Sequence, residues 1–199
     1  MANHAKFDRQ QVIDKATSLY WEKGFHATSM RNLQDVIDMR PGSIYAAFGS
    51  KEGLFKEALQ HYTEQGVARL AACRANSASP VAALKLFMEQ LVINTQQGAP
   101  SGMCMLAKTV AELTGEHEEL LQEAKRSFRK MESEFEKLIV EAQEMGEVDK
   151  EKDPHQLARH IQVQISGLRT YARVNGPDEG ENGAPLKQMI EDVFKHYPF

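Results

Sequence analysis

The sequence has little cysteine and no long apolar run, and each shortage excludes a class of protein. Cys73 and Cys104 are the only cysteines among 199 residues, too few for the disulfide framework of a small secreted domain. No apolar run reaches the roughly 18 residues that a membrane-spanning helix needs. The first residues, 1–6, lack the apolar stretch of a secretory signal. We therefore expect a cytoplasmic protein that makes no contact with a membrane.

Basic charge is also scarce, because 24 Lys and Arg stand against 28 Asp and Glu and the net charge is −4. The charges are unevenly distributed along the chain. Residues 1–56 hold eight basic and six acidic side chains, a balance of +2, whereas residues 57–199 hold sixteen and twenty-two, a balance of −6. A mildly basic segment over residues 1–56, followed by an acidic segment over residues 57–199, would direct DNA toward the N-terminal part.

Several signatures of enzymes are missing. None of the seven histidines has Glu or Asp three residues before it, which is the spacing that a carboxylate metal centre in a helical bundle requires. The patterns of a phosphate-binding loop, a nucleophile elbow and a dinucleotide site are absent. We therefore expect no catalytic residue, no metal and no cofactor. The alternatives are a helical metal-binding enzyme and an adaptor that binds only protein.

What the sequence does contain is helical periodicity, with proline and glycine gathered at the boundaries. No stretch shows the sustained period-two alternation of a half-buried strand. The expected fold is all-α, with about nine helices in two domains, residues 1–56 and residues 57–199. The longer helices are expected over residues 51–74, 80–97, 103–113, 117–145, 154–174 and 185–197.

Capping signals mark three short helices near the N-terminus. Asp8 stands before the apolar stripe of the first helix, and Gly24 ends that helix. Thr28 or Ser29 caps the second helix, and Pro41 occupies the first position of the third, where no backbone N–H is needed. Three short helices with a tight turn between the second and third predict a helix-turn-helix, whose third helix enters the major groove of DNA.

The side of the third helix that faces away from the module's core carries small and polar residues. Small side chains would let the backbone approach the groove closely. Lys51 begins the next helix and could contact a phosphate there, because a helix N-terminus favours anions. The residues on the open side are Arg40, Pro41, Gly42, Ser43, Ala46 and Ala47.

The segments 25–30 and 42–55 resemble the signature of the TetR family of transcriptional regulators. That signature is an aromatic residue after glycine, a Thr or Ser cap, and a Gly-x-x-Tyr-x-x-Phe-x-x-Lys-Glu-x-Leu run, and the resemblance covers about residues 8–58. It implies a repressor that binds a pseudo-palindromic operator as a homodimer and is released by a small molecule. The residues implied in phosphate contact are Ser29, Tyr45 and Lys51, and those implied in reading bases or nearby backbone are Arg40, Pro41, Gly42 and Ser43.

Two positions depart from the family's pattern. Asp38 stands where the turn usually has glycine, and Arg40 stands where the reading helix usually has a Ser or Thr cap. Arg40 could exchange a capping bond for a contact with a base.

The domain over residues 57–199 carries aromatic, methionine and leucine side chains at helical spacing. They are either ordinary core or the wall of an effector pocket, since methionine accommodates varied ligands. Such a lining would suit an apolar or amphipathic effector. The candidate pocket residues are Phe87, Leu91, Met103, Cys104, Lys108, Phe128, Met131 and Tyr171.

Cys104 is expected in the first turn of the helix over 103–113, with Lys108 four residues further on the same face. A helix N-terminus and a nearby ammonium group both favour a thiolate. The stretch 104–112 also resembles the corresponding segment of NemR-type regulators, TetR proteins that respond to electrophiles and oxidants through a cysteine there. Cys104 is therefore either a sensing thiol for an electrophilic effector or an inert core residue.

The last two expected helices carry apolar stripes wide enough for both a core and a partner face. In the TetR family, two such helices from each subunit form a four-helix dimer interface. The alternative is that the stripes are only core within one subunit. Their members are Leu157, Ile161, Ile165, Leu168, Leu186, Met189, Ile190 and Val193.

Overall fold

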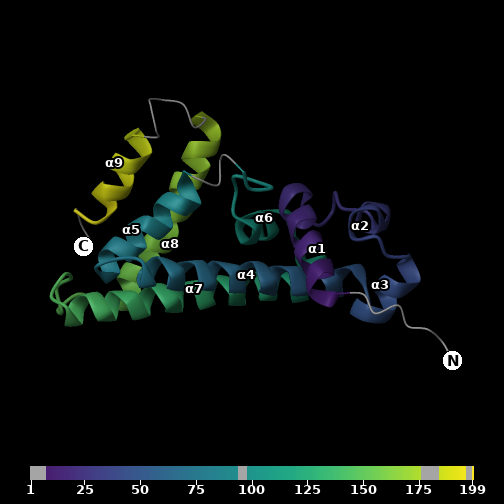
Figure 1. Cartoon of the computed structure of the whole chain (residues 1–199), viewed down its shortest axis with the longest axis horizontal. Coiled ribbons are helices and arrows are strands. Elements are labelled where there is room, and N and C mark those ends of the chain that lie inside the picture. Colours follow the sequence, from purple (N-terminus) through teal and green to yellow (C-terminus); the bar gives the residue numbers. More distant parts are fainter. Residues whose placement is uncertain (1–7, 94–97, 176–183, 196–198) are drawn as a thin grey trace.

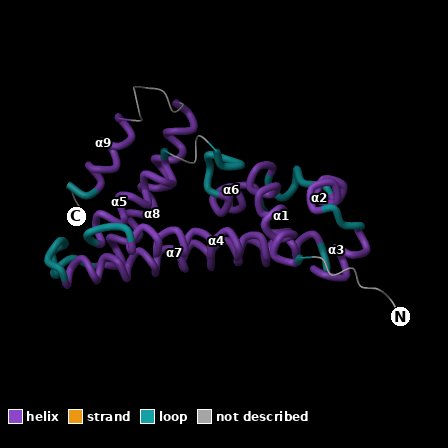
Figure 2. The backbone as a smooth tube through the Cα atoms, in the orientation of Figure 1, coloured by secondary structure: helices purple, strands orange, loops and turns teal. Residues whose placement is uncertain are grey.

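The computed structural model describes residues 8–93, 98–175, 184–195 and 199, and this part of the chain consists of helices and loops (Figure 2). The all-α prediction is confirmed over these ranges, which hold nine α-helices, one 3-10 helix and no strand. None of the described helices is long and apolar enough to cross a membrane. The elements are α1 (Arg9–Lys23), α2 (Met30–Ile37), α3 (Pro41–Phe48), α4 (Lys51–Ala75), α5 (Pro80–Val92), α6 (Met105–Glu112), η2 (Gly115–His117), α7 (Glu118–Glu144), α8 (Pro154–Asn175) and α9 (Ala184–Val193).

The three N-terminal helices begin at capping residues that the sequence predicted. Asp8 begins α1 by accepting two backbone N–H groups with its carboxylate. Ser29, and not Thr28, caps α2, because Ser29 forms a reciprocal capping box with Asn32 while Thr28 is buried. Pro41 is the first residue of α3.

Two helix boundaries differ from the prediction in a way that matters for the site. The backbone of Cys104 is extended, with φ −65° and ψ 131°, so Cys104 is the N-cap of α6 and does not lie in its first turn. The helix expected over 80–97 ends at Val92 as α5. Residues 94–97 of that prediction, and residues 196 and 197 of the expected last helix, lie outside the described residues.

The long helices α4 and α7 run side by side in the same direction and form the spine of the molecule (Figure 1). Contacts at both ends establish the direction, since Gln60 binds Glu123 and Arg74 binds Glu141. Helices α1 to α3 lie at one end of this spine, α5, α8 and α9 lie at the other end, and α6 lies between them (Figure 1).

The buried core forms two clusters. One joins α1 to α3 with the first half of α4, α6 and the start of α7. The other joins the second half of α4 with α5, α8, α9 and the rest of α7. Helix α4 belongs to both clusters, so one continuous helix crosses the domain boundary expected at residues 56 and 57 and links the two ends of the protein.

Candidate DNA-binding surface and effector cavity

The turn between α2 and α3 depends on an unusual backbone conformation at Asp38. Asp38 has φ 54° and ψ 46°, the left-handed region that most residues avoid and that Asp and Asn tolerate best after glycine. Met39 and Arg40 then lead into α3, and Arg40 makes no side-chain capping bond. The departure from glycine at position 38 therefore preserves the turn.

Helix α3 divides cleanly into a buried and an exposed side. Ile44 and Phe48 are buried in the core of the module, as their spacing predicted. The opposite side faces solvent, and Tyr45 is its largest exposed side chain, at 49%. Six predicted DNA-contact residues are exposed: Ser29, Arg40, Pro41, Gly42, Ser43 and Tyr45.

Lys51 differs from these six, because its ammonium group is turned into the module. Its Nζ donates to the carbonyl oxygen of Phe25 at 2.6 Å and lies 4.1 Å from the centre of the Phe25 ring. Burial lowers the pKa of Lys51, and the nearby carboxylates of Glu52 and Glu112 oppose that shift. In this geometry the Lys51 ammonium joins the start of α4 to the turn before α2, and its contact with a DNA phosphate stays a prediction.

A cavity lies where α1, α4, α5, α6, α7 and α8 meet, and it encloses about 680 Å³ of space not filled by atoms, part of it open to solvent. Five of the eight candidate pocket residues line it: Phe87, Leu91, Cys104, Phe128 and Met131. The other lining residues are Trp21, Tyr62, Thr63, Gln65, Gly66, Arg69, Leu106, Phe135, Gln162, Ile165, Ser166 and Arg169.

Three candidate pocket residues do not line the cavity, and each has another position. The carbonyl of Met103 accepts a hydrogen bond from the Trp21 indole. The ammonium of Lys108 donates to the carbonyls of Trp21 and Glu22, 2.8 and 2.9 Å away, so it is turned toward α1 and not toward the cysteine. Tyr171 is 42% exposed on the outer side of α8. The expected pairing of Lys108 with the Cys104 thiol is therefore replaced by a contact between helices.

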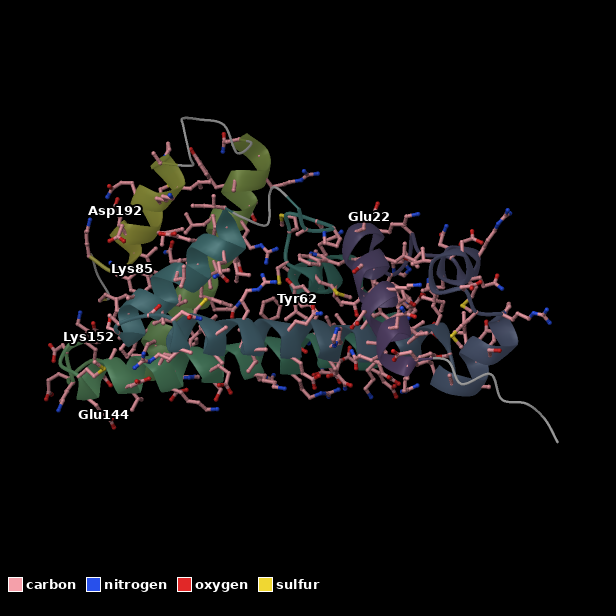
Figure 3. All side chains as sticks on the ribbon, in the orientation of Figure 1. Glu22, Tyr62, Lys85, Glu144, Lys152 and Asp192 are labelled. Carbon is pink, nitrogen blue, oxygen red and sulfur yellow. The ribbon has the colours of Figure 1, made fainter. Side chains whose placement is uncertain are left out.

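Sequence reasoning missed the polar end of the cavity. The phenol of Tyr62 points from α4 toward α6 (Figure 3), and Arg169 of α8 approaches its oxygen with Nη1 at 3.4 Å. Burial raises the pKa of Tyr62, the neighbouring Cys104 raises it further, and the Arg169 guanidinium opposes both. A signal for Arg169 was present, because it follows Ile165 by four residues and so falls on the apolar stripe of α8.

Helix α6 also holds the end of α1 and the turn that follows it. The Glu112 carboxylate accepts the backbone N–H groups of Phe25 and His26 at 3.0 and 2.6 Å. Lys108, one turn earlier on α6, binds the last carbonyls of α1. The helix that begins at the cavity with Cys104 therefore ends on the helix-turn-helix module.

The apolar stripes expected to face a partner are largely core within the subunit. Seven of their eight members are buried: Leu157, Ile161, Ile165, Leu168, Leu186, Ile190 and Val193. The eighth, Met189, is exposed, and three residues outside the expected stripes are exposed as well: Val163 at 66%, Val174 at 78% and Tyr171 at 42%. Val163, Gly167, Tyr171 and Val174 follow one another at intervals of four, four and three residues, which places them on one face of α8.

Two family models match the chain. The model described as "Bacterial regulatory proteins, tetR family" matches residues 12–58, and "Tetracyclin repressor-like, C-terminal domain" matches residues 80–184. A curated relative is the HTH-type transcriptional repressor ComR of Escherichia coli (strain K12), which is 26% identical over 96% of this chain and 90% of that protein.

Solved structures share the fold along almost the whole chain. A cysteine-substituted variant of the TetR family regulator CifR, solved with operator DNA, superposes with a TM-score of 0.84, at 24% identity over 99% of this chain and 100% of that one. The reduced form of Escherichia coli NemR superposes with a TM-score of 0.76, at 16% identity over 93% of this chain and 94% of that one.

Proposed function

The chain belongs to the TetR family of bacterial regulatory proteins, and we propose that it is a repressor whose affinity for DNA is controlled by a molecule bound in the cavity. The single observation that carries the proposal is the exposed side of α3, where Arg40 to Ser43 and Tyr45 stand in solvent on a rigid three-helix module. In this proposal the protein acts in the cytoplasm, where its operator is, and needs no catalytic residue, metal or cofactor.

The DNA contact follows from the shape and chemistry of α3. Gly42 and Ser43 keep the N-terminal turn of the helix narrow, so its backbone can approach the base edges of a major groove. The Arg40 side chain, which forms no cap, is available for a bidentate contact with guanine. The Tyr45 hydroxyl suits a phosphate oxygen, since phosphate contacts fix the register of the protein on the duplex.

Gel-shift titrations with the DNA upstream of the chain's own gene test this proposal. Tyr45→Ala should weaken binding to all sequences alike with little change in its salt dependence, because the phenol carries no charge, whereas Arg40→Ala should flatten the salt dependence and relax the base preference at one position. Arg129→Ala is the matched control for Arg40→Ala, because it also removes one guanidinium, from an exposed position on α7. A folded Tyr45→Ala protein that binds with the wild-type affinity would contradict the proposed contact.

The exposed face of α8 supports a homodimer, which would present two reading helices to the half-sites of a pseudo-palindrome. The face consists of Val163, Gly167, Tyr171 and Val174, and no atom of the described residues lies within 4 Å of a Cβ built on Gly167. A glycine in the middle of an apolar face allows a second helix to approach closely. Met189 of α9 is a further exposed apolar residue of the C-terminal helices.

Sedimentation velocity at micromolar concentration tests the dimer. We expect a dimer for the wild type and a monomer for Val174→Glu, because a carboxylate in an apolar interface loses its hydration. Val140→Glu, on the exposed surface of α7, is the control and should remain dimeric. A wild-type monomer at this concentration would remove the dimer from the proposal.

Two connections could carry a signal from the cavity to the DNA. Helix α4 contributes Tyr62 to the cavity wall and begins at Lys51 in the module. Helix α6 begins at Cys104 in the cavity wall and ends on the backbone of Phe25 and His26 through Glu112. A ligand releases DNA only if it prefers the geometry that does not bind DNA, and a shift of either helix would change the spacing of the reading helices.

A further inference from the structure

The cavity contains a buried positive charge whose hydrogen bonding is incomplete. Arg169 is only 2% exposed. Its Nε donates to the carbonyl of Gly102 at 3.0 Å and its Nη1 approaches the Tyr62 hydroxyl at 3.4 Å, whereas Nη2 has no hydrogen-bond partner among the residues that the structure describes. Buried guanidinium groups are normally paired with an anion, because removing a charge from water is costly.

The chain supplies no such anion among the described residues that line the cavity. These residues include a second guanidinium, that of Arg69, and no Asp or Glu. The Tyr62 phenol cannot serve as the counter-charge, because burial raises its pKa and keeps it neutral. Gln162 adds a second incomplete group to this wall, since no donor in the described part of the chain binds its buried Oε1.

The rest of the cavity wall is apolar. Phe87 and Phe135 stand edge to face with their ring centres 5.8 Å apart, and Leu91, Met131 and Ile165 continue the surface. Gln162, Ile165, Ser166 and Arg169 share one face of α8. The cavity therefore combines an apolar wall with one strip that carries a buried cation.

We propose that the cavity binds an amphipathic carboxylate, whose acid group pairs with Arg169 and whose apolar part lies against Phe87 and Phe135. The inference rests on the proposed effector role and names the ligand's chemical class. A carboxylate matches the planar fork of a guanidinium and forms charge-assisted bonds that an alcohol cannot. The Tyr62 O–H donates either to the second carboxylate oxygen or to the Cys104 sulfur. In both arrangements the acid group lies beside the thiol, because Cys104 adjoins the Tyr62 hydroxyl.

Direct binding to the full chain tests the inference without any DNA. Trp21 is the only tryptophan and lines the cavity, so its fluorescence reports occupancy, and calorimetry gives the affinity independently. The probes are two matched sets, each used below its aggregation limit: octanoate, octanol and octylamine, and phenylacetate, phenylethanol and phenethylamine. We expect the acid of at least one set to bind at least tenfold more tightly than its alcohol and amine.

Arg169→Met separates the charge from the shape of the side chain. The variant should lose at least tenfold in affinity for the acid and keep its affinity for the alcohol, because only the acid needs the cation. Arg159→Met removes a guanidinium from an exposed position on the same helix and should bind as the wild type does. Circular dichroism checks the fold, and Arg169→Met should melt at the wild-type temperature or above it, since an unpaired buried charge is lost.

The outcomes separate this inference from the proposed function. If acids and alcohols of both sets bind equally, or if Arg169→Met leaves acid affinity unchanged, the carboxylate inference is wrong and the repressor proposal is untouched. If the acids bind through Arg169 but the gel-shift titrations find no DNA binding, the ligand class stands and the repressor proposal fails. Should Arg169→Met not fold, the comparison of acids with amines on the wild type decides the matter, because a buried cation favours the acid and repels the amine.

Discussion

The indole N–H of Trp21 in α1 donates a hydrogen bond to the carbonyl oxygen of Met103, 2.7 Å away and just before α6. The same indole lines the cavity and meets the ring of Tyr62 edge to face at 5.1 Å. One side chain of the DNA-binding module therefore touches both the cavity and the segment leading into α6. A ligand that displaces Tyr62 or Cys104 would act on α1 directly.

We predict that Trp21→Phe lowers the free energy of unfolding by about 1 kcal/mol or more, because the Met103 carbonyl loses its donor and the smaller ring leaves a gap. Urea denaturation followed by circular dichroism measures the change. Wild-type stability in this variant would mean that the bond between α1 and the start of α6 contributes nothing to the fold.

Lys51→Met should lower the free energy of unfolding by about 1–2 kcal/mol, because it removes both the bond to the Phe25 carbonyl and the contact with the Phe25 ring. Lys56→Met makes the same change five residues further along α4 and should have little effect. Thermal denaturation of both variants gives the comparison. If Lys51→Met weakened DNA binding at unchanged stability, Lys51 would be a phosphate contact, as the family resemblance implied.

Cys104 should be the only thiol through which an electrophile releases DNA. It is half-buried in the cavity wall, whereas Cys73 is 2% exposed and burial raises the pKa of the Cys73 thiol. We expect N-ethylmaleimide or hypochlorite to release DNA from the wild type and from Cys73→Ser, and not from Cys104→Ser. Equal release from both serine variants, or none from the wild type, would leave noncovalent binding as the route of control.

The pair formed by Arg74 and Glu141 should make stability depend on pH. Hydrogen bonds from Arg74 lower the pKa of Glu141 in the folded protein, and burial opposes the shift. A depressed carboxyl pKa adds stability above the unfolded value, about 4.3, and this stability is lost as pH falls through the folded value. Glu141→Gln should therefore be less stable than the wild type near neutral pH, and the difference should vanish in acid.

Urea titrations at about pH 7 and pH 3 measure this effect. Glu144→Gln, at an exposed position on the same helix, is the control and should follow the wild type at both values. A difference between Glu141→Gln and the wild type that is the same at both pH values would show that the ion pair is not its cause.

Sequence alone was sufficient for the helix-turn-helix. Asp8, Ser29, Pro41 and Ser50 begin helices because each satisfies or avoids a backbone N–H within three residues of itself. The spacing of Ile44 and Phe48 likewise identified the buried side of α3. These interactions are local, so the order of residues contains all the information that they need.

The cavity required the tertiary structure, because its wall is assembled from six helices that are distant in sequence. Five candidate residues line this wall, since an aromatic or soft side chain at helical spacing indicates an inward face, and their contact with an effector stays a prediction. Lys108 was assigned to the wrong neighbour, because spacing shows which side chains share a face and not which helix that face meets. Here the face of Lys108 meets the end of α1.

The same limit applies to α8. Its apolar periodicity determined that one face is buried, and the structure decided that this face packs within the subunit and leaves Val163 and Val174 outside. The sequence also placed Arg169 on the buried face without indicating what it would meet. Only the packing of α8 against α5 and α7 left its guanidinium beside Tyr62, with one nitrogen unpaired among the described residues. A buried charge needs a partner because the fold has removed it from water, and that removal is a property of the assembled helices.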